Sequence, residues 1–464
     1  MYPQDIRASL GVKMLRSIFE QFVQESPVSV MARGLMERVF APERMDKLFE
    51  THAKVQHQQE LLFSSQVDLM SLVVCGIQKS VHAAYKARAT NLIVSTTALY
   101  KKLCGVELSV SQALVRETAS DLRVLIEIMG GEQPNPLPGY RHKIVDGTCL
   151  AATDHRLDAI RLFAAKALPG KAIVVLDPLS KLVIDIILCQ DGHANERSLF
   201  DNVLSGVQPN DVWTGDRNFC TAKFLWTIAQ QKAFFVIRQH GSLGWTELST
   251  LRALGQTDTG NLFEQCIEIC YEGNRLKCRR VVLKLFVPTR DKEWEIAILT
   301  NLPLSHADAA KIAELYRNRW SLETLFQTVT ENFNAEIQTL AYPKAALFSF
   351  SMALVTYNIL ATLKAALGSV HGIAKIDAGL SDFYLVDEIQ GTYRGMMIAI
   401  PSQQWEIFRT YSLDQMGQLL QQLATGVNLK RFLKAIRSPK KKRQPLIVDH
   451  RHRHVSTARL LDIY

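Results

Sequence analysis

The chain has 464 residues, enough for about three domain-sized units, and its hydrophobic fraction of 47% excludes a chain without a packed core. Lys and Arg number 54 against 45 Asp and Glu, so the formal net charge of +9 suits a polyanionic partner without proving one. The eight cysteines contain no C-x-x-C pair and no common zinc spacing, which indicates small apolar residues in a reducing compartment.

The amino-terminal region, residues 1–129, is predicted to be helical because apolar residues recur at three- and four-residue spacing. Its opening, MYPQDIRASLG, lacks the apolar core of a signal peptide. Residues 94–107 are similar to the second helix of a helix-turn-helix, with Ser95 as the N-cap. The residues that this helix would offer to a DNA groove are Thr96, Thr97, Tyr100 and Lys101.

Residues 130–139, GGEQPNPLPG, are rich in turn formers and are predicted to be a domain boundary. After them, short β-rich runs alternate with helical stretches, an order typical of the α/β class. The predicted elements are strands at 143–152, 171–177 and 181–189, the latter two as a hairpin, a helix near 196–204, a strand at 211–216, a helix at about 221–231 and a strand at 233–238.

Residues 241–302 change to strand after strand, which predicts an antiparallel β insertion. Helical periodicity resumes at Ser305 and continues past Phe333. Residues 345–363 carry no charge, but their five Ser, Thr and Asn side chains argue against a membrane span. We therefore predict a buried core helix there, no membrane partner and a soluble, cytosolic protein.

Two aspartates follow apolar strand sequences. Asp146 is predicted to end one strand, before Gly147 and Thr148, and Asp216 is predicted to end another. Carboxylates at neighbouring strand ends can converge on one point while the sheet holds them rigidly. Neither aspartate is specific alone, because an Asp after a strand is more often a turn residue or a helix cap.

The third acidic residue lies in the sequence ELYRNRWSLETLFQTVTENF, residues 314–333. If this stretch is one continuous helix, at about 100° per residue, then Tyr316, Arg319 and Glu323 share one narrow face. The alternative is that Arg319 and Glu323 form an ordinary i, i+4 surface pair, which leaves Tyr316 beside them unexplained.

This segment resembles the Y-x2-R-x3-E signature of bacterial insertion-sequence transposases of the DDE type, matched here by Tyr316, Arg319 and Glu323. The Asp-Gly-Thr that begins at Asp146 stands where that family carries its first acidic residue. The Gly-Asp-Arg around Asp216 stands at the place of the second. The three motifs together are far more specific than any one of them.

The resemblance extends over residues 140–363 and implies a ribonuclease H-like core with the β insertion of the hairpin-forming branch. One departure stands at Thr330, where the family signature has Lys, so that DNA contact is missing or comes from a residue such as Lys344 or the basic tail. The implied domains are a helical DNA-binding domain (1–129), a catalytic core (140–240 and 303–345), a β insertion (241–302) and a helical C-terminal region with a basic tail (346–464).

The resemblance implies a DNA transposase, which nicks transposon ends and joins them to target DNA, here by cut-and-paste through a hairpin. Asp146, Asp216 and Glu323 would hold two divalent ions about 3.5–4 Å apart. Clustered carboxylates need such cations because like charges raise one another's pKa, and oxygen ligands favour Mg²⁺, with Mn²⁺ as a substitute. The implied partners are inverted-repeat ends and target DNA, bound by a homodimer in the cytoplasm beside the nucleoid.

Other side chains have a functional and an ordinary interpretation. Arg238 resembles the arginine that family members place near the DNA end, with a buried salt bridge as the alternative. Trp294 is close to where relatives carry a Trp that stacks on a flipped base; Trp245 is the rival, and a core role is open for both. Trp320 is expected in packing or in DNA backbone contact, and His193, without partners for zinc, in a loop or capping role.

The carboxyl-terminal end is strongly basic, since residues 430–454 hold ten Lys or Arg and one acid. We predict a DNA-facing strip there that includes His450, His452 and His454. Two other function classes remain as alternatives. A sequence-nonspecific ribonuclease H-like nuclease would leave the helical amino-terminal region unexplained, and a non-enzymatic DNA-binding protein would be favoured by an altered triad, whereas all three acids are present here.

Overall fold

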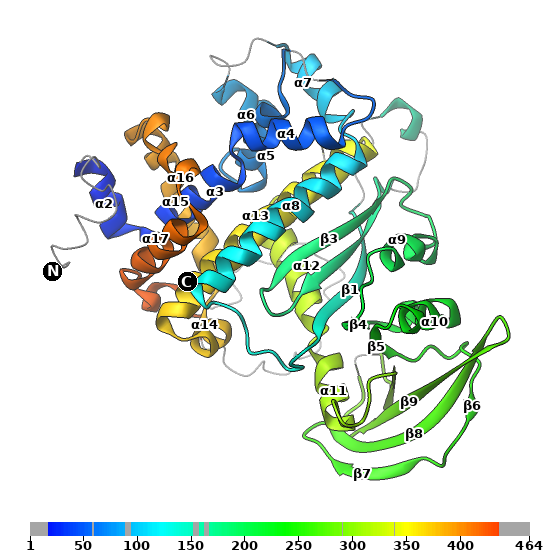
Figure 1. The fold of residues 1–464 in the computed structure, drawn as a ribbon. Helices are drawn as coiled ribbons and strands as arrows, with labels where there is room; N and C mark the ends of the chain where they lie inside the picture. Colours follow the sequence, from blue (N-terminus) through cyan, green and yellow to red (C-terminus); the bar gives the residue numbers. More distant parts are fainter. Residues whose placement is uncertain are drawn as a thin grey trace, which may run out of the picture.

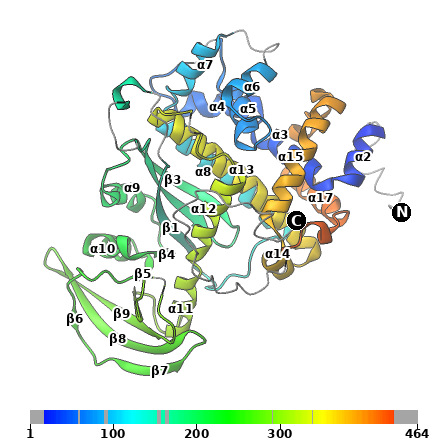
Figure 2. The same ribbon diagram turned by 180° about the vertical axis from the view of Figure 1, so that it is seen from behind.

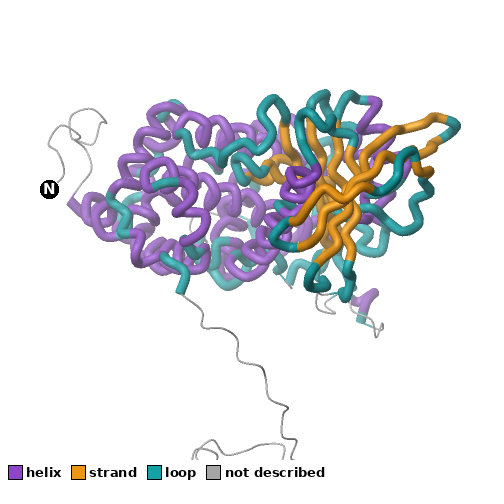
Figure 3. Tube along the Cα trace, turned by 90° about the horizontal axis from the view of Figure 1, so that it is seen from below, coloured by secondary structure: helices purple, strands orange, loops and turns teal. Residues whose placement is uncertain are grey.

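A ten-stranded sheet occupies one end of the molecule and a body of helices the other (Figures 1 and 3). The computed structural model describes residues 17–57, 60–88, 94–151, 157–161, 167–289, 291–337 and 339–435, so the basic tail beyond them lies outside the described residues. The strands are β1 (Arg141–Cys149), β2 (Lys171–Asp177), β3 (Leu182–Cys189), β4 (Asp211–Gly215), β5 (Phe234–Arg238), β6 (Thr246–Glu247), β7 (Arg252–Gln256), β8 (Gly260–Tyr271), β9 (Asn274–Leu285) and β10 (Glu295–Thr300).

The order of the strands is β3-β2-β1-β4-β5-β10-β9-β8-β6, with β7 beside β8. β1 runs antiparallel to β2 and parallel to β4, and β4 runs parallel to β5. The predicted hairpin is confirmed as the antiparallel β2–β3 pair. The predicted strands of the insertion are present as β6 to β10, and they extend the same sheet because β10 pairs antiparallel with β5.

β1 differs from the expectation at Asp146, which does not end the strand. The ladder between β1 and β4 stops at the pair Val145–Gly215, whereas the ladder with β2 continues through Asp146 to Cys149. The prediction that Asp146 ends a strand is therefore wrong on the β2 side. Asp146 stands one residue past the last pair with β4.

Both faces of the first strands are buried, which explains their unbroken apolar sequences. Ile144 and Val174 pack with α8 (Leu108–Met129) and α13 (Pro343–His371), which run side by side along the sheet (Figures 1 and 2). Val145, on the opposite face, packs with α9 (Phe200–Leu204) and α10 (Ala222–Gln230). Because side chains alternate along a strand, Asp146 shares the face of Ile144.

All regular secondary structure in the described part of residues 1–129 is helical, as predicted. The remaining helices are α2 (Ser17–Glu25), α3 (Pro27–Val39), α4 (Pro42–His52), α5 (Phe63–Val74), α6 (Val81–Ala87), α7 (Thr96–Leu103), α11 (Ala309–Arg317), α12 (Trp320–Asn332), α14 (Ile373–Gly379), α15 (Asp382–Ala399), α16 (Ile407–Thr410) and α17 (Leu413–Thr425).

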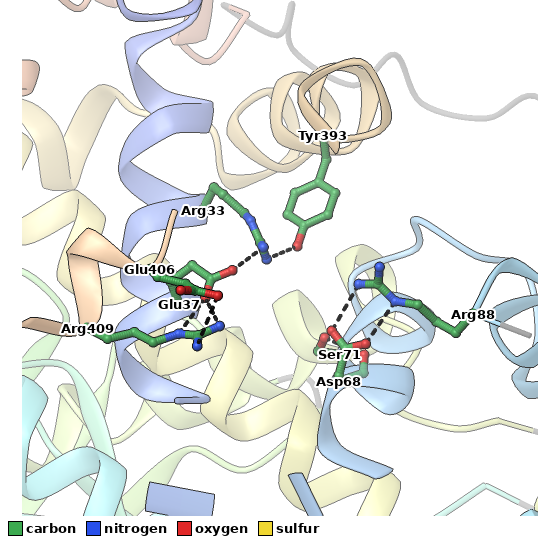
Figure 4. Close-up of polar contacts among 8 residues, drawn as sticks. All are labelled: Arg33, Glu37, Asp68, Ser71, Arg88, Tyr393, Glu406 and Arg409. Atoms are coloured by element: carbon green, nitrogen blue, oxygen red, sulfur yellow. Dashed lines mark hydrogen bonds and ion pairs between the residues drawn. The ribbon is translucent and has the colours of Figure 1, made fainter. Parts of the chain in front are cut away.

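Polar contacts join helices from the two ends of the chain (Figure 4). From α3, Arg33 donates to the Tyr393 hydroxyl of α15 at 2.5 Å, and Glu37 accepts from Arg409 of α16 at 2.8 Å. Buried apolar residues of α3, α8, α13 and α17 belong to one hydrophobic core. The division of these helices into separate domains stays a prediction. Because they share one core, helices from the amino-terminal and carboxyl-terminal parts of the chain stabilise one another.

The uncharged segment at residues 345–363 lies within α13, and the predicted buried core helix is confirmed. Among the described residues α13 is the one helix long and apolar enough to cross a membrane, and 89% of its most apolar window is buried inside the protein. Its polar side chains have partners there. Asn358 accepts from the backbone N–H of Val183 and donates to the Val183 carbonyl, each at 2.8 Å, which satisfies the edge of β3.

Candidate catalytic site

The parallel pair β1–β4 places Asp146 and Asp216 beside one another, because each follows a member of the paired residues Val145 and Gly215. Local backbone groups orient both carboxylates. Asp146 accepts a hydrogen bond from the N–H of Gly147 at 2.9 Å. Asp216 accepts from the N–H of Asn218 at 2.8 Å and so caps the short 3₁₀ helix η5 (Arg217–Phe219). Two acidic groups thus meet where β4 ends.

The prediction of one continuous helix over residues 314–333 is wrong. α11 ends at Arg317, and α12 begins at Trp320. Between them the N–H of Arg319 donates to the Tyr316 carbonyl at 3.1 Å, three residues back, so this turn is wound more tightly than an α-helix, while Asn318 and Arg319 keep helical backbone angles. The helical wheel drawn across this turn is therefore only approximate, although Tyr316, Arg319 and Glu323 do lie together as it predicted.

The side chains of the signature nevertheless meet at the sheet. Arg319 donates to Asp146 at 2.8 Å and to Glu323 at 2.8 Å, and its guanidinium carbon lies 5.8 Å from the centre of the Tyr316 ring. Arg319 is only 8% exposed, whereas the Glu323 side chain is 43% exposed. Arg319 is thus more than a partner in a surface pair, since it joins the third predicted carboxylate to the first.

Burial and neighbouring acidic groups disfavour the ionised form of Asp146. Burial raises the pKa of Asp146 to about 7, and the neighbouring charges of Asp216 and Glu196 add to this rise, while Arg319 opposes it. Burial is also the main reason that the pKa of Tyr316 is raised. Asp146 therefore needs more positive charge nearby than Arg319 alone provides to be fully ionised at neutral pH.

A divalent cation fits this site in charge and in donor type, because carboxylate oxygens are the ligands that Mg²⁺ and Mn²⁺ prefer. Within the described part of the chain, no three His, Cys, Asp or Glu side chains lie close enough to hold one ion together. The guanidinium of Arg319 stands between Asp146 and Glu323. Joint binding of a metal ion by the three predicted residues therefore requires Arg319 to move out of that space.

Arg238, at the end of β5, forms the salt bridge that was the alternative to a DNA contact. Its partner is Glu293, which also accepts from Arg217 at 3.0 Å, one residue after Asp216. Arg238 interacts with the Tyr316 hydroxyl as well. It therefore lies at the border of the site, and a role in DNA binding stays a prediction.

The predicted tryptophans are on the surface. Trp294 precedes β10 and is 61% exposed, and Trp320 begins α12 and is 59% exposed, so a core role is excluded for both. Trp245 is partly covered, with the Arg280 guanidinium 5.4 Å from its ring centre. Trp294 directly follows Glu293, which pairs with Arg217 and Arg238 at the border of the site.

The helix expected within residues 94–107 is present as α7, and Ser95 caps it by accepting from the Ala98 N–H at 3.2 Å, while its role in DNA recognition stays a prediction. It lies at the far end of the molecule from α11 (Figures 1 and 2). The structure does not bring these residues to the carboxylates: Thr96, Thr97, Tyr100 and Lys101.

Three further expectations concern single residues. Thr330 lies exposed on α12, and Lys344, suggested as its substitute, instead interacts with Glu107 near the start of α13. His193 has the predicted loop role, since its N–H donates to Asp191 at 2.9 Å. Of the predicted basic strip, residues 430–435 are described, and Arg431 there pairs with Glu388 at 2.9 Å. The rest of the strip, with His450, His452 and His454, lies outside the described residues.

Sequence reasoning missed one acidic neighbour of the site. Glu196 opens the 3₁₀ helix η4 (Glu196–Leu199), which follows the loop after β3. It accepts from the Asn218 side chain at 2.8 Å and raises the pKa of Asp146. The sequence gives little signal for this, because Glu196 belongs to no motif and its contacts, Gly147 and Asn218, are distant from it in the sequence.

Comparisons with known proteins identify similar sequences. Residues 137–359 match the family described as "Transposase DDE domain". Over 206 residues the chain is 27% identical to the "Probable transposase for insertion sequence element IS5377" of Geobacillus stearothermophilus, which covers 43% of this chain and 49% of that protein. The chain thus spans about half the length of this curated relative. These similarities support the prediction that the chain is related to insertion-sequence DDE transposases.

Among solved structures, the cryo-EM structure of a piggyBac transposase synaptic complex with hairpin DNA aligns over 84% of this chain and 86% of that one. The sequences are 10% identical in this alignment, and the TM-score is 0.39, which does not establish a common fold.

Proposed function

We propose, on the premise that residues 137–359 match the transposase DDE domain family, that this protein is an insertion-sequence transposase. It would cut DNA at the ends of its element and join those ends to target DNA. The observation that carries the proposal is the meeting of Asp146, Asp216 and Arg319, with Glu323 bound to the same guanidinium. Strands β3-β2-β1-β4-β5, of which β1, β4 and β5 are parallel, support a ribonuclease H-like core.

Asp146, Asp216 and Glu323 would hold Mg²⁺ or Mn²⁺. When bound, the divalent ions supply charge stabilisation for both the attacking and the leaving oxygen of a phosphodiester. The raised pKa of Asp146 supports this assignment, because a buried carboxyl beside like charges is stabilised in its ionised form by a cation. The exposed position of Glu323 leaves its carboxylate room to turn from Arg319 toward the aspartates.

The other residues of the site would position DNA. Arg319, once released from Asp146, presents a planar guanidinium to a phosphate next to the bond that is cut. The Tyr316 hydroxyl lies between Arg319 and Arg238 and would donate to the same backbone. Arg217 and Arg238 are held by Glu293, and a phosphate would compete with that carboxylate for both guanidiniums.

Cut-and-paste through a hairpin is the finer form of the proposal. A hairpin requires the terminal bases to unstack, and an aromatic side chain compensates part of that cost. Trp294 is exposed, precedes β10 and follows Glu293, which supports it as the stacking residue. A protein with this function acts in the cytoplasm beside the chromosome.

A homodimer around two paired ends completes the proposal. Mixing wild type with an Asp146→Asn variant should lower strand transfer beyond simple dilution if two chains act together. A linear response to the mixing ratio, with one chain per DNA end by light scattering, would contradict the dimer.

A strand-transfer assay with Mg²⁺ tests the function itself, using DNA that carries the inverted repeats flanking the gene. A transposase cleaves at the repeat ends and joins them to a second DNA. Cleavage at many positions without joining would identify a nonspecific nuclease. Specific binding without cleavage would identify a DNA-binding protein that is not an enzyme.

A further inference from the structure

Glu196 lies against the backbone of β1 beside Asp146. A Cβ atom on Gly147 would overlap both oxygens of the Glu196 carboxylate, so only glycine leaves space for that carboxylate to reach the strand. Gly147 is the residue that follows Asp146 and whose N–H orients it. The Glu196 carboxylate is therefore in direct contact with the segment of β1 that sets the position of the first predicted metal ligand.

A second contact joins Glu196 to the segment that carries Asp216. Its Oε1 accepts from the Asn218 side-chain amide at 2.8 Å, and the N–H of the same Asn218 is capped by Asp216. Arg197 holds the other end of the Asn218 amide at 3.3 Å. Glu196 thus touches the neighbour of Asp146 and the neighbour of Asp216 at once.

No cation in the described part of the chain forms an ion pair with Glu196. Lys171 and Arg197 lie close enough for their charges to lower the pKa of Glu196, but their hydrogen bonds go to the Ala194 carbonyl and to Asn218. Burial raises the pKa of Glu196, and the charge of Asp216 adds to the rise. A partly buried carboxylate without a cation partner is costly, and it is stabilised if a cation binds beside it.

We propose that Glu196 is a fourth acidic residue of the site, which positions Asp146 and Asp216 and adds negative charge that strengthens divalent-cation binding at that pair. The inference deepens the proposed function and rests on it, because the cation is the one assigned to Asp146, Asp216 and Glu323. Glu196 is a positioning residue in this proposal, acting through Gly147 and Asn218.

Binding of Mn²⁺ to the full chain without DNA tests the proposal, measured by isothermal titration and by electron paramagnetic resonance. Glu196→Gln removes the charge and keeps an oxygen that accepts from Asn218. It should weaken Mn²⁺ binding about tenfold, the scale typical of residues that support metal ligands, without lowering Tm in the absence of metal. Glu196→Asp keeps the charge and should bind Mn²⁺ more tightly than Glu196→Gln.

Asp201→Asn is the matched control, because it removes one exposed acid from α9, where Asp201 pairs with Lys223, and should leave Mn²⁺ affinity unchanged. Asp146→Asn is the reference and should abolish tight binding. If Glu196→Gln bound Mn²⁺ as tightly as wild type, or if Glu196→Gln and Glu196→Asp lost equal Mn²⁺ affinity, the role of Glu196 would be overturned while the proposed metal site would stand. Wild-type affinity in Asp146→Asn would overturn the proposed metal site and, with it, this inference.

Discussion

Arg319 donates to Asp146 at 2.8 Å from the break between two helices. This contact fastens α12 to β1, so the helix that carries Glu323 is held against the strand that carries the first aspartate. It also provides the positive charge closest to Asp146. The same guanidinium has an Nε atom that is buried and makes no hydrogen bond, so its present position leaves one donor unused. Arg319 therefore joins α12 to β1 while one of its buried donors has no hydrogen-bond partner.

Replacing Arg319 with Ala should lower the free energy of unfolding of the metal-free protein by about 1–3 kcal/mol, because Asp146 loses a buried hydrogen-bonding partner. Saturating Mg²⁺ should restore more stability to this variant than to wild type, since the cation replaces the lost charge. Urea unfolding with and without Mg²⁺ measures both effects. Arg317→Ala, an exposed change at the end of α11, serves as the control. If Mg²⁺ raised the free energy of unfolding equally in wild type, Arg319→Ala and Arg317→Ala, the metal ion and the Arg319 guanidinium would not compete for the same position beside Asp146.

The raised pKa of Asp146 predicts a dependence of stability on pH. Because its folded pKa of about 7 lies above the ordinary aspartate value of 3.8, the folded state binds the extra proton, and stability is lost as pH rises from about 4 to about 7. Asp146→Asn should remove this part of the slope, so the difference in free energy of unfolding between variant and wild type should grow over that range and level off above it. Unfolding curves at several pH values without metal provide the test. A constant difference from pH 4 to pH 8 would show that Asp146 ionises normally.

Trp294→Ala should leave the first nick nearly intact and slow hairpin formation about ten- to hundredfold, which corresponds to the ~1–3 kcal/mol of one base–aromatic stack. Pre-nicked DNA that lacks the flipped base should recover much of the lost rate. Separate single-turnover measurements of nicking and hairpin formation distinguish the two steps. Trp245→Ala is the comparison, because its ring is already covered by Arg280. Equal loss of nicking and hairpin formation in Trp294→Ala would rule out base stacking as its role.

The elements that could be predicted from sequence are those whose pattern is set by burial. The apolar runs of β2 and β3 and the uncharged α13 have the structure expected because each is covered on both sides. Ser95 could be recognised as an N-cap because capping depends on residues three positions apart. These features are local, or they follow from hydrophobicity alone.

Other features depend on neighbours that are distant in the sequence. The break between α11 and α12 places Arg319 against Asp146, and nothing between Glu314 and Phe333 marks it, since no Pro or Gly lies there. Whether Asp146 ends β1 is decided by how far β2 and β4 extend beside it. The contacts of Glu196 with Gly147 and Asn218 likewise exist only after the sheet has formed.

The central claim is that Asp146, Asp216 and Glu323 act together as the acidic residues of a transposase. The most direct measurement is single-turnover cleavage of DNA carrying the element's own ends, with Mg²⁺, by wild type and by Asp146→Asn, Asp216→Asn and Glu323→Gln. The account predicts that each change lowers the cleavage rate by at least about a thousandfold, or ~4 kcal/mol of activation free energy, while end binding stays measurable. Cleavage by any one variant at a rate close to that of wild type would contradict the assignment of that residue to the site.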